Sequence, residues 1–265
     1  GGSYYTPKPV FSGLQRITEF PKDYYYTTAI TDSAVSFIRQ HPVDEPMFMY
    51  LAHYAPHLPL QAPKERVEAC RERYKAGYDV LRKQRFERIR RNGLIDIEGE
   101  LPVFEKEFGG KRPAWNSLTP QQQERWITEM ATYAAMIEIM DDGIGEVIKA
   151  TKEKGIFDNT IFLFLSDNGA TNEGDMITQL RADLSNTPFR SYKQWCFQGG
   201  TSAPLIIMYG GGQPDGKKGA VRHEFTHIID LFPTCLDMAS IEYPREFQNH
   251  AIDAPGGRTI LPALK

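Results

Sequence analysis

The tripeptide Asp167-Asn168-Gly169 follows an apolar run in the sequence TIFLFLSDNGA, residues 160–170. A carboxylate beside an amide offers hard oxygen donors, which suit Ca²⁺ or Mg²⁺ and do not suit soft metals. Asp-Asn-Gly is also a common turn sequence, so the tripeptide alone leaves a turn and a metal site open. Because Ca²⁺ takes about 6–8 oxygen ligands, other residues must complete any such site.

Two basic residues could handle an anionic substrate beside such a cation. His57 lies in the proline-bounded sequence APHLPLQAP, and Lys193 precedes the Gly199-Gly200 pair. A histidine and a lysine near a divalent cation can neutralise an oxyanion and protonate a leaving oxygen. Each residue, taken singly, is equally compatible with a structural or surface position, and the sequence alone does not bring them together.

Hydrophobic patterning predicts the elements that must position these residues. The predicted helices cover 27–40, 130–154 and 227–240, and the predicted strands cover 47–52, 160–166 and 203–209. Continuously apolar strands indicate burial on both faces, which is typical of a parallel sheet. Alternating helices and strands favour an α/β sandwich, in which ligands bind beyond the carboxyl ends of the strands.

Residues 64–128 form a charged, helical segment of different character. Its basic stretch predicts either a solvated helix face or a patch that attracts anions, and it contains Arg82, Lys83, Arg85, Arg88, Arg90 and Arg91. The sequence LTPQQQERW near its end predicts a helix start, with Thr119 as N-cap, Pro120 at the first helical position and Gln122 closing a capping box.

Composition narrows the classes of protein that fit. The chain has 265 residues and a formal net charge of −3, which gives no electrostatic case for a nucleic-acid or membrane partner. Cys70, Cys196 and Cys235 are too scattered for a disulfide framework or a zinc site. The first residues, GGSYYTPKPVF, contain no initiator methionine and no signal-peptide core, so we expect a processed chain or a piece of a longer protein.

Several spaced motifs together resemble the type I sulfatases, the arylsulfatase-like branch of the alkaline-phosphatase superfamily. The stretches that carry the resemblance are PMFMYLAHYAPHLPLQAP, MATYAAMIEIMDDGIGEVIKATKEKGIFDNTIFLFLSDNGA, SNTPFRSYKQWCFQGGTSAPLII and HIIDLFPTCLDMASIEYP. The resemblance implies an α/β/α sandwich with a mixed, largely parallel sheet, incomplete at both ends. It implies that residues 1–265 are part of a sulfatase catalytic domain, with 64–128 as a charged helical insertion.

The resemblance also implies roles for individual residues. Asp167 and Asn168 match metal ligands, usually for Ca²⁺, with Mg²⁺ also possible. His57 matches the histidine that protonates the leaving oxygen, and Lys193 matches the lysine that binds the sulfate. The expected substrate is a sulfate-ester small molecule or a sulfated glycan. The expected location is the periplasm, the extracellular space or the lysosome.

Three departures from the family pattern affect the activity expected of this chain. The family nucleophile is a formylglycine made in a C/S-x-P/A-x-R motif, and no cysteine or serine here heads such a motif. The first Asp-Asp metal pair is also missing, since Asp141-Asp142 falls within a helical pattern and reads as a solvated helix face. Gln198 replaces the usual Glu before Gly-Gly. We therefore expect this chain alone to be inactive and to need a further N-terminal segment or chain.

Two alternatives remain open at this stage. A non-catalytic pseudo-sulfatase could bind sulfated glycans through Lys193, His57 and the basic stretch 82–91. A phosphodiesterase or phosphatase of the same superfamily would use two metals, but SDNGATNEGD lacks the Asp-His pairing expected for it.

Overall fold

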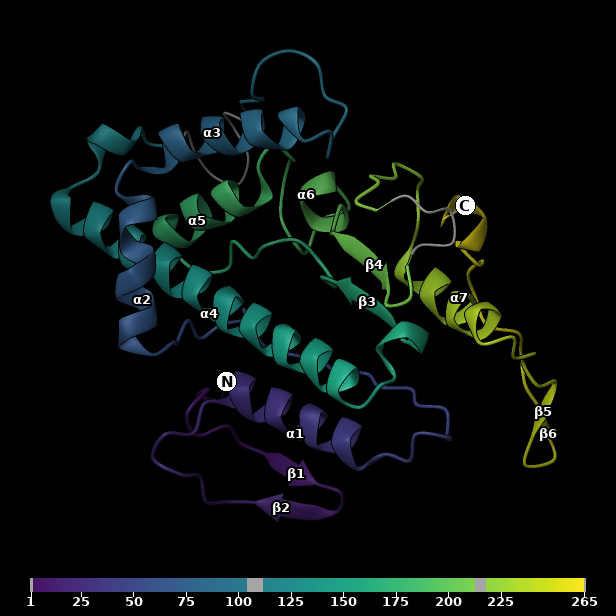
Figure 1. The fold of residues 1–265 in the computed structure, drawn as a ribbon. Coiled ribbons are helices and arrows are strands. Elements are labelled where there is room, and N and C mark those ends of the chain that lie inside the picture. Colours follow the sequence, from purple (N-terminus) through teal and green to yellow (C-terminus); the bar gives the residue numbers. More distant parts are fainter. Residues whose placement is uncertain (1, 104–111, 213–217, 265) are drawn as a thin grey trace.

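The computed structural model describes residues 2–103, 112–212 and 218–264 (Figure 1). In chain order the elements are β1 (Val10–Ser12), β2 (Gln15–Ile17), α1 (Tyr26–Gln40), α2 (Lys64–Arg71), η1 (Glu72–Tyr74), α3 (Tyr78–Arg91), η2 (Trp115–Ser117), α4 (Pro120–Glu153), η3 (Phe157–Asn159), β3 (Ile161–Leu165), α5 (Met176–Asn186), α6 (Gln198–Thr201), β4 (Leu205–Tyr209), η4 (Ile228–Asp230), α7 (Leu231–Met238), β5 (Glu246–Phe247), β6 (His250–Ala251) and η5 (Leu261–Leu264). None of these described helices is both long and apolar enough to cross a membrane.

The long helix α4 begins and ends as its sequence predicts. The Thr119 side chain accepts from the Gln122 amide at 3.2 Å, and the Gln122 side chain accepts from the Thr119 amide at 2.9 Å. Gly155 follows the helix with a φ of 77°, a left-handed conformation that glycine adopts without steric cost. These signals fix a helix of 34 residues that crosses the molecule (Figure 1).

Helix α4 contributes to every buried apolar cluster in the described part of the chain. Trp126 and Met130 pack against α3 and α5, Met136 packs against Tyr4 and Tyr25, and Val147 and Ala150 pack against α1. A short-side-chain face of α4, Ala131, Ala134 and Ala135, receives Cys70 of α2. Segments far apart in sequence are therefore held against one helix.

Strands β3 and β4 form an antiparallel pair. The register places Ile161 opposite Tyr209 and Leu165 opposite Leu205. Each strand pairing among the described residues is antiparallel, so these residues do not form the parallel part of the expected sheet. Continuous apolarity indicates burial, and it does not encode strand direction. The mixed α/β class is confirmed, with α4 and α7 on opposite sides of the pair in Figure 1.

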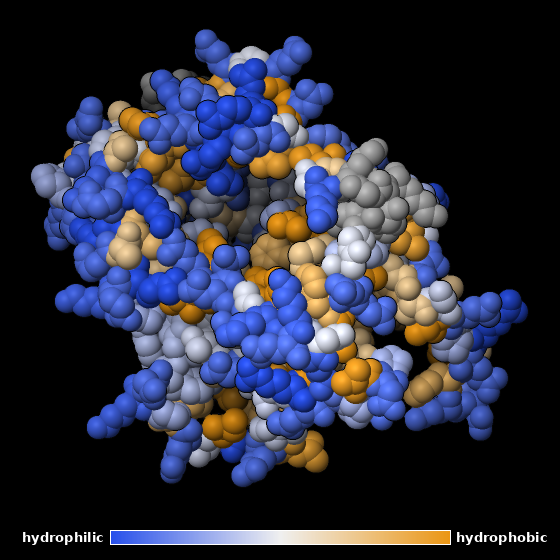
Figure 2. Space-filling model, in the orientation of Figure 1, coloured by the Kyte–Doolittle hydropathy of each residue, from blue (hydrophilic) through white to orange (hydrophobic). Residues whose placement is uncertain are grey.

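The strand predicted over 47–52 is not formed, and this prediction is corrected. The segment is extended, and Met47, Met49 and Leu51 pack against the cluster of α1 and α4. Phe48 and Tyr50 alternate with them and are 82% and 84% exposed. No described residue pairs with the backbone of this segment, and a strand needs a hydrogen-bonded neighbour. Figure 2 shows further apolar surface around β3 and β4, where Ile206 is exposed.

The basic stretch of α3 divides into buried and exposed residues. Arg82 is buried and its Nε donates to Thr187 Oγ1 at 3.0 Å, while Arg85 Nε donates to the Thr187 carbonyl at 3.2 Å. Lys83, Arg88, Arg90 and Arg91 are exposed. The prediction of one solvated face is therefore wrong for Arg82 and Arg85, because both hold the chain just after α5.

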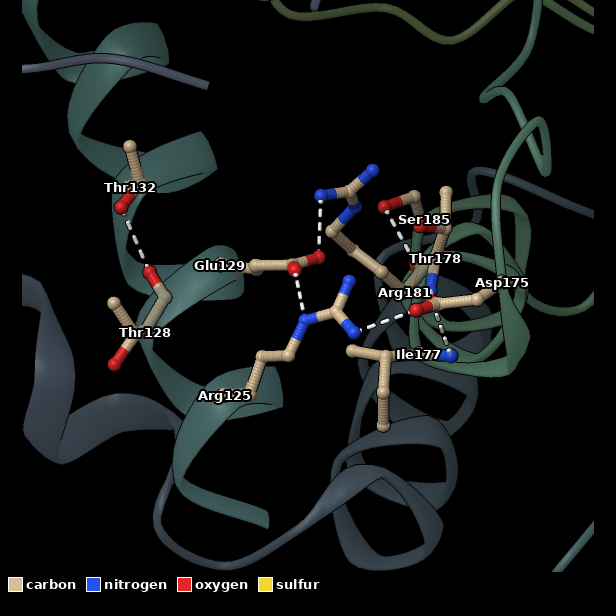
Figure 3. Close-up of polar contacts among 9 residues, drawn as sticks. All are labelled: Arg125, Thr128, Glu129, Thr132, Asp175, Ile177, Thr178, Arg181 and Ser185. Atoms are coloured by element: carbon tan, nitrogen blue, oxygen red, sulfur yellow. Dashed lines mark hydrogen bonds and ion pairs between the residues drawn. The ribbon is translucent and has the colours of Figure 1, made fainter. Parts of the chain in front are cut away.

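A charged network fixes α5 against α4 (Figure 3). Glu129 accepts from Arg125 Nε at 2.8 Å and from the buried Arg181 at 2.9 Å. Arg125 also donates to Asp175 Oδ2 at 2.5 Å, and Asp175 Oδ1 caps α5 by accepting from the Ile177 and Thr178 amides. Burial acts to raise the pKa of Asp175, but hydrogen bonds from Arg125 and these amides outweigh it and lower that pKa.

We predict that the cap contributes more than the ion pair at Asp175. Asp175→Ala should lower the free energy of unfolding by about 1 kcal/mol, because it removes the N-cap acceptor. Asp175→Asn keeps an acceptor and should cost less, since exposed ion pairs contribute about 0–1 kcal/mol. Urea denaturation measures both; equal losses would contradict the capping role.

The pH dependence of the same variants separates the two contributions. A carboxyl whose pKa is lowered on folding stabilises the protein above its unfolded pKa, and the effect disappears as pH falls through the folded pKa. The difference between wild type and Asp175→Asn should thus persist above about pH 4 and vanish in more acidic solution. A difference independent of pH would contradict this assignment.

We also predict that the extended segment drives self-association. Unpaired strands with exposed apolar side chains template pairing with other chains. The double variant Phe48→Thr/Tyr50→Thr should lower concentration-dependent light scattering while changing the free energy of unfolding by less than about 0.5 kcal/mol. Leu14→Thr is the matched control, because Leu14 is fully exposed in the turn between β1 and β2. An equal effect of the control would argue for general surface hydrophobicity.

Candidate active site

The loop after β3 carries the predicted metal ligands. Asp167 is exposed and Asn168 is half-buried. Ser166 Oγ donates to the Asn168 carbonyl at 2.9 Å, and Asn168 Nδ2 donates to the Gly169 carbonyl at 3.0 Å. Because the amide nitrogen faces its own backbone, the amide oxygen is the Asn168 atom suited to a cation. The chain bends at the carboxyl end of the strand, as predicted for Asp167-Asn168.

The loop that carries Lys193 runs alongside this first loop. The Lys193 amide donates to the Ala170 carbonyl at 3.0 Å, and Gln194 Nε2 donates to Asn172 Oδ1 at 2.7 Å. Residues 167–173 and 190–200 are therefore joined through main chain and side chains. The structure brings the Lys193 backbone to the loop that carries Asp167 and Asn168.

Glycines permit the two loops to cross at contact distance. A Cβ on Gly169 would lie 1.7 Å from the Gly199 carbonyl oxygen of the other loop, whereas one on Gly199 would lie 2.0 Å from the Ser191 oxygen within its own loop. The Gly169 amide donates to the Gly200 carbonyl at 3.1 Å. The missing side chain of Gly169 therefore makes room for the backbone of the second loop.

Asn186, the last residue of α5, links the two loops from beneath. Its side chain is buried, and Oδ1 accepts from the Ala170 amide at 2.9 Å while Nδ2 donates to the Ser191 carbonyl at 2.9 Å. Ser191 adopts a φ of 68°, an uncommon left-handed conformation for a residue with a side chain. Sequence reasoning missed Asn186, because nothing in NTPFR distinguishes it from an ordinary turn residue.

Buried contacts also fix the residue directly before Lys193. Tyr192 is 3% exposed, and its hydroxyl donates to Asp183 Oδ1 at 2.6 Å. Arg112 pairs with the other oxygen of Asp183 at 2.5 Å. Burial, together with the charge of Asp183, raises the pKa of Tyr192, so the hydroxyl stays protonated and donates. The Lys193 backbone is thus held from both sides.

The Lys193 ammonium group is paired with an acidic side chain. Lys193 Nζ lies 3.1 Å from Glu173 Oε2, and the lysine side chain is 23% exposed. Thr171 Oγ1 lies 3.2 Å from the same carboxylate oxygen and accepts from the Glu173 amide at 3.1 Å. The hydrogen bond from Lys193 and its charge lower the pKa of Glu173, with a further contribution from His57. Sequence reasoning missed Glu173, although it is a charge within SDNGATNEGD.

His57 lies on an exposed loop whose backbone is anchored. Its amide donates to the Tyr54 carbonyl at 3.0 Å, and its carbonyl accepts from the Tyr4 hydroxyl at 2.9 Å. The ring Nδ1 lies 2.8 Å from the Leu58 carbonyl, and the Tyr54 ring centroid is 5.0 Å from that of His57. No direct contact joins His57 to Lys193 among the described residues.

The residue types fit a hard cation, but the donor set is small. In the described ranges, no group of three or more His, Cys, Asp and Glu side chains could hold a metal ion. Asp167 and Asn168 contribute oxygen donors of the kind that Ca²⁺ and Mg²⁺ prefer. Asp141 and Asp142 do not join them, because both lie exposed on α4 and Asp142 pairs with Arg66 at 2.7 Å.

The cysteines contribute nothing to this arrangement. Cys70, Cys196 and Cys235 are free. Cys70 is buried on α2 beside Glu138, and burial raises the pKa of its thiol. A thiol with a raised pKa is a poor nucleophile at neutral pH. Cys196 is exposed within the Lys193 loop.

We predict that Asn186 maintains the paired loops. Asn186→Ala should lower the free energy of unfolding by about 2–4 kcal/mol, because it removes two buried hydrogen bonds, one from the Ala170 amide and one to the Ser191 carbonyl. Asn159→Ala is the control, since Asn159 is an exposed residue of η3 and should change stability by less than about 0.5 kcal/mol. Urea denaturation measures both; similar values for the two would contradict the linking role.

Comparisons with known proteins indicate the family to which this chain belongs. The chain matches the Sulfatase family over residues 3–241. It is 31% identical over 269 residues to an uncharacterized sulfatase of Schizosaccharomyces pombe, covering 89% of this chain and 47% of that protein. It is 31% identical over 250 residues to an arylsulfatase of Klebsiella aerogenes, covering 84% and 52% respectively. The chain therefore spans about half the length of these curated relatives.

Solved structures agree on the fold. Ps i-CgsB in complex with k-i-k-neocarrahexaose aligns with a TM-score of 0.60 at 22% identity, covering 97% of this chain and 41% of that one. BT4656 in complex with its substrate, D-glucosamine-2-N,6-O-disulfate, aligns with a TM-score of 0.58 at 18% identity, covering 99% and 56%. These likenesses support an alkaline-phosphatase-like fold. With the family match over 3–241, they establish that the chain belongs to the sulfatase family.

Proposed function

We propose that this chain is part of the catalytic domain of an enzyme that hydrolyses sulfate esters. The observation that carries the proposal is the Lys193 ammonium group, which holds an anionic side chain at 3.1 Å beside the Asp167-Asn168 loop. A fixed cation next to hard oxygen donors suits a sulfate group, whose oxygens accept charge-assisted hydrogen bonds. Residues 1–265 would then form part of one catalytic domain, and 64–128 would be a charged insertion that supports it.

His57 is the group we assign to protonate the leaving oxygen. Nδ1 donates to the Leu58 carbonyl at 2.8 Å, so in the doubly protonated ring the Nε2 proton is the one free to be transferred, and Nδ1 keeps its own. A proton delivered to the ester oxygen lets the alcohol leave as a neutral molecule. Lys193 contributes by neutralising a sulfate oxygen as charge shifts toward the leaving group.

Asp167 and Asn168 are the residues we assign to a Ca²⁺ ion, with Mg²⁺ as the alternative. When bound, such a cation neutralises sulfate oxygens and fixes their position. The side-chain oxygens of Asp167 and Asn168 would hold the ion from the carboxyl end of β3. The remaining ligands and the formylglycine nucleophile would come from a part of the protein outside these residues, an N-terminal segment or a separate chain.

The relatives indicate the substrate class. One relative, 32% identical over 137 residues, is an N-acetylgalactosamine-6-sulfatase of Sus scrofa, covering 52% of this chain and 24% of that protein. Another is an arylsulfatase, and one solved structure holds a sulfated glucosamine as its substrate. We propose an aryl or carbohydrate sulfate ester as the substrate. We also propose action in the periplasm, outside the cell or in the lysosome.

Activity measurements on a longer protein that contains these residues test the assignment. We would produce it with a formylglycine-generating enzyme and assay an aryl sulfate and sulfated sugars. His57→Gln should lower kcat roughly 10²–10⁴-fold, the usual contribution of a general acid. Asp167→Ala and Lys193→Met should also abolish most activity. Lys149→Met is the control, because Lys149 is an exposed residue of α4 paired with Glu146.

The outcomes separate the enzyme from the alternatives. Activity in wild type and Lys149→Met, but not in the site variants, would support a metal-dependent sulfatase. Folded, inactive proteins that still bind sulfated glycans would favour the pseudo-sulfatase. Hydrolysis of phosphate esters in preference to sulfate esters would favour the phosphodiesterase or phosphatase alternative.

A further inference from the structure

The strongest unassigned feature is the carboxylate seated on Lys193. We propose that Glu173 is an internal competitor, which occupies the anion position on Lys193 until a sulfate group displaces it. The proposal rests on the proposed function, because it takes Lys193 as the residue that receives the sulfate. Glu173 would then determine how tightly Lys193 binds an anion and which anions can bind there.

The position of Glu173 favours competition over a purely structural contact. Its Oε2 lies 3.1 Å from Lys193 Nζ, a distance at which a sulfate oxygen would also bind. The pKa of Glu173 is lowered first by Lys193 and also by His57, so its carboxylate lies in the field of both residues assigned to the substrate.

The two side chains of this ion pair differ in exposure. The Lys193 side chain is 23% exposed and its amide is fixed on the Ala170 carbonyl, whereas the Glu173 side chain is 61% exposed. Exposed ion pairs contribute little to stability and exchange readily with solvent. An arriving anion can therefore displace the more exposed glutamate, while the Lys193 backbone stays fixed to Ala170.

Thr171 keeps the Glu173 carboxylate next to Lys193. Its hydroxyl lies 3.2 Å from Glu173 Oε2 and accepts from the Glu173 amide at 3.1 Å, which closes a tight turn. The neighbouring Asn172 is tied to Gln194 at 2.7 Å. These contacts hold the carboxylate close to Lys193 and raise its effective concentration there. Weakly bound anions then fail to displace it, and a sulfate group with more oxygens and additional contacts succeeds.

The test is sulfate binding by the chain itself, which is independent of catalysis. Sodium sulfate would be titrated against sodium chloride at constant ionic strength and pH, and the Ala170, Lys193 and Gln194 amides followed by NMR. Glu173→Gln removes the competing charge and should tighten sulfate binding roughly three- to ten-fold. Thr171→Val changes no charge but releases the carboxylate, and it should tighten binding by a smaller factor.

Glu146→Gln is the matched control for net charge. Glu146 is an exposed residue of α4 that lies outside both loops. Like Glu173, it pairs with a lysine, in its case Lys149 at 3.3 Å. Its removal should leave sulfate binding unchanged. Tighter binding in Glu173→Gln and Thr171→Val, with no change in Glu146→Gln, is the expected result.

Three results would overturn the proposal. Unchanged affinity in Glu173→Gln would show that Lys193 is not held back by the carboxylate. Equal gains in Glu173→Gln and Glu146→Gln, with none in Thr171→Val, would indicate a general charge effect. Absence of saturable binding in Glu173→Gln would mean that the vacated lysine does not take sulfate. A different result would separate the two proposals. If the longer protein is inactive but Glu173→Gln binds sulfate more tightly, the proposed hydrolysis is refuted, while Glu173 still competes with sulfate for Lys193.

Discussion

The buried faces of α4 are the constraint on which the described structure depends. Every apolar cluster in the described part of the chain includes side chains of this helix, from Trp126 near its start to Ala150 near its end. Burial of apolar surface is the main favourable term in folding, and here it is concentrated on one element. Helices far apart in sequence are held together because each packs against α4.

The residues proposed for the site lie on loops that are attached to α4 through α5. Helix α5 is fixed to α4 by the network of Arg125, Glu129 and Arg181, and a loop leaves from each of its ends. One loop carries Asp167 and Asn168, and the other carries Lys193. Asn186 joins the loops at the point where α5 ends. Loops held in this way keep the precision of a helix while they present polar groups to a ligand.

Local signals were enough to predict much of this arrangement. The capping box at Thr119 and the stop at Gly155 defined α4, and the apolar runs located β3 and β4. Strand direction and the unpaired state of 47–52 were not predictable, because both depend on neighbours distant in sequence. The hydrophobic pattern of the sequence likewise does not predict the ion pair of Lys193 with Glu173 or the two hydrogen bonds by which Asn186 joins the loops. Each of these contacts forms only after the loops meet.

Because the backbones of Gly169 and Gly199 are in contact, the two loops behave as one rigid unit. A loop transplanted from another protein would carry a Cβ into the crossing unless it had glycine at position 169, and a Cβ at position 199 would meet the Ser191 oxygen of its own loop. The backbone of this region therefore cannot vary, and substitutions are confined to side chains that project from it. Trp195 and Phe197, exposed on the Lys193 loop, are such positions. Recognition of new ligands can evolve there while the polar groups beneath keep their spacing.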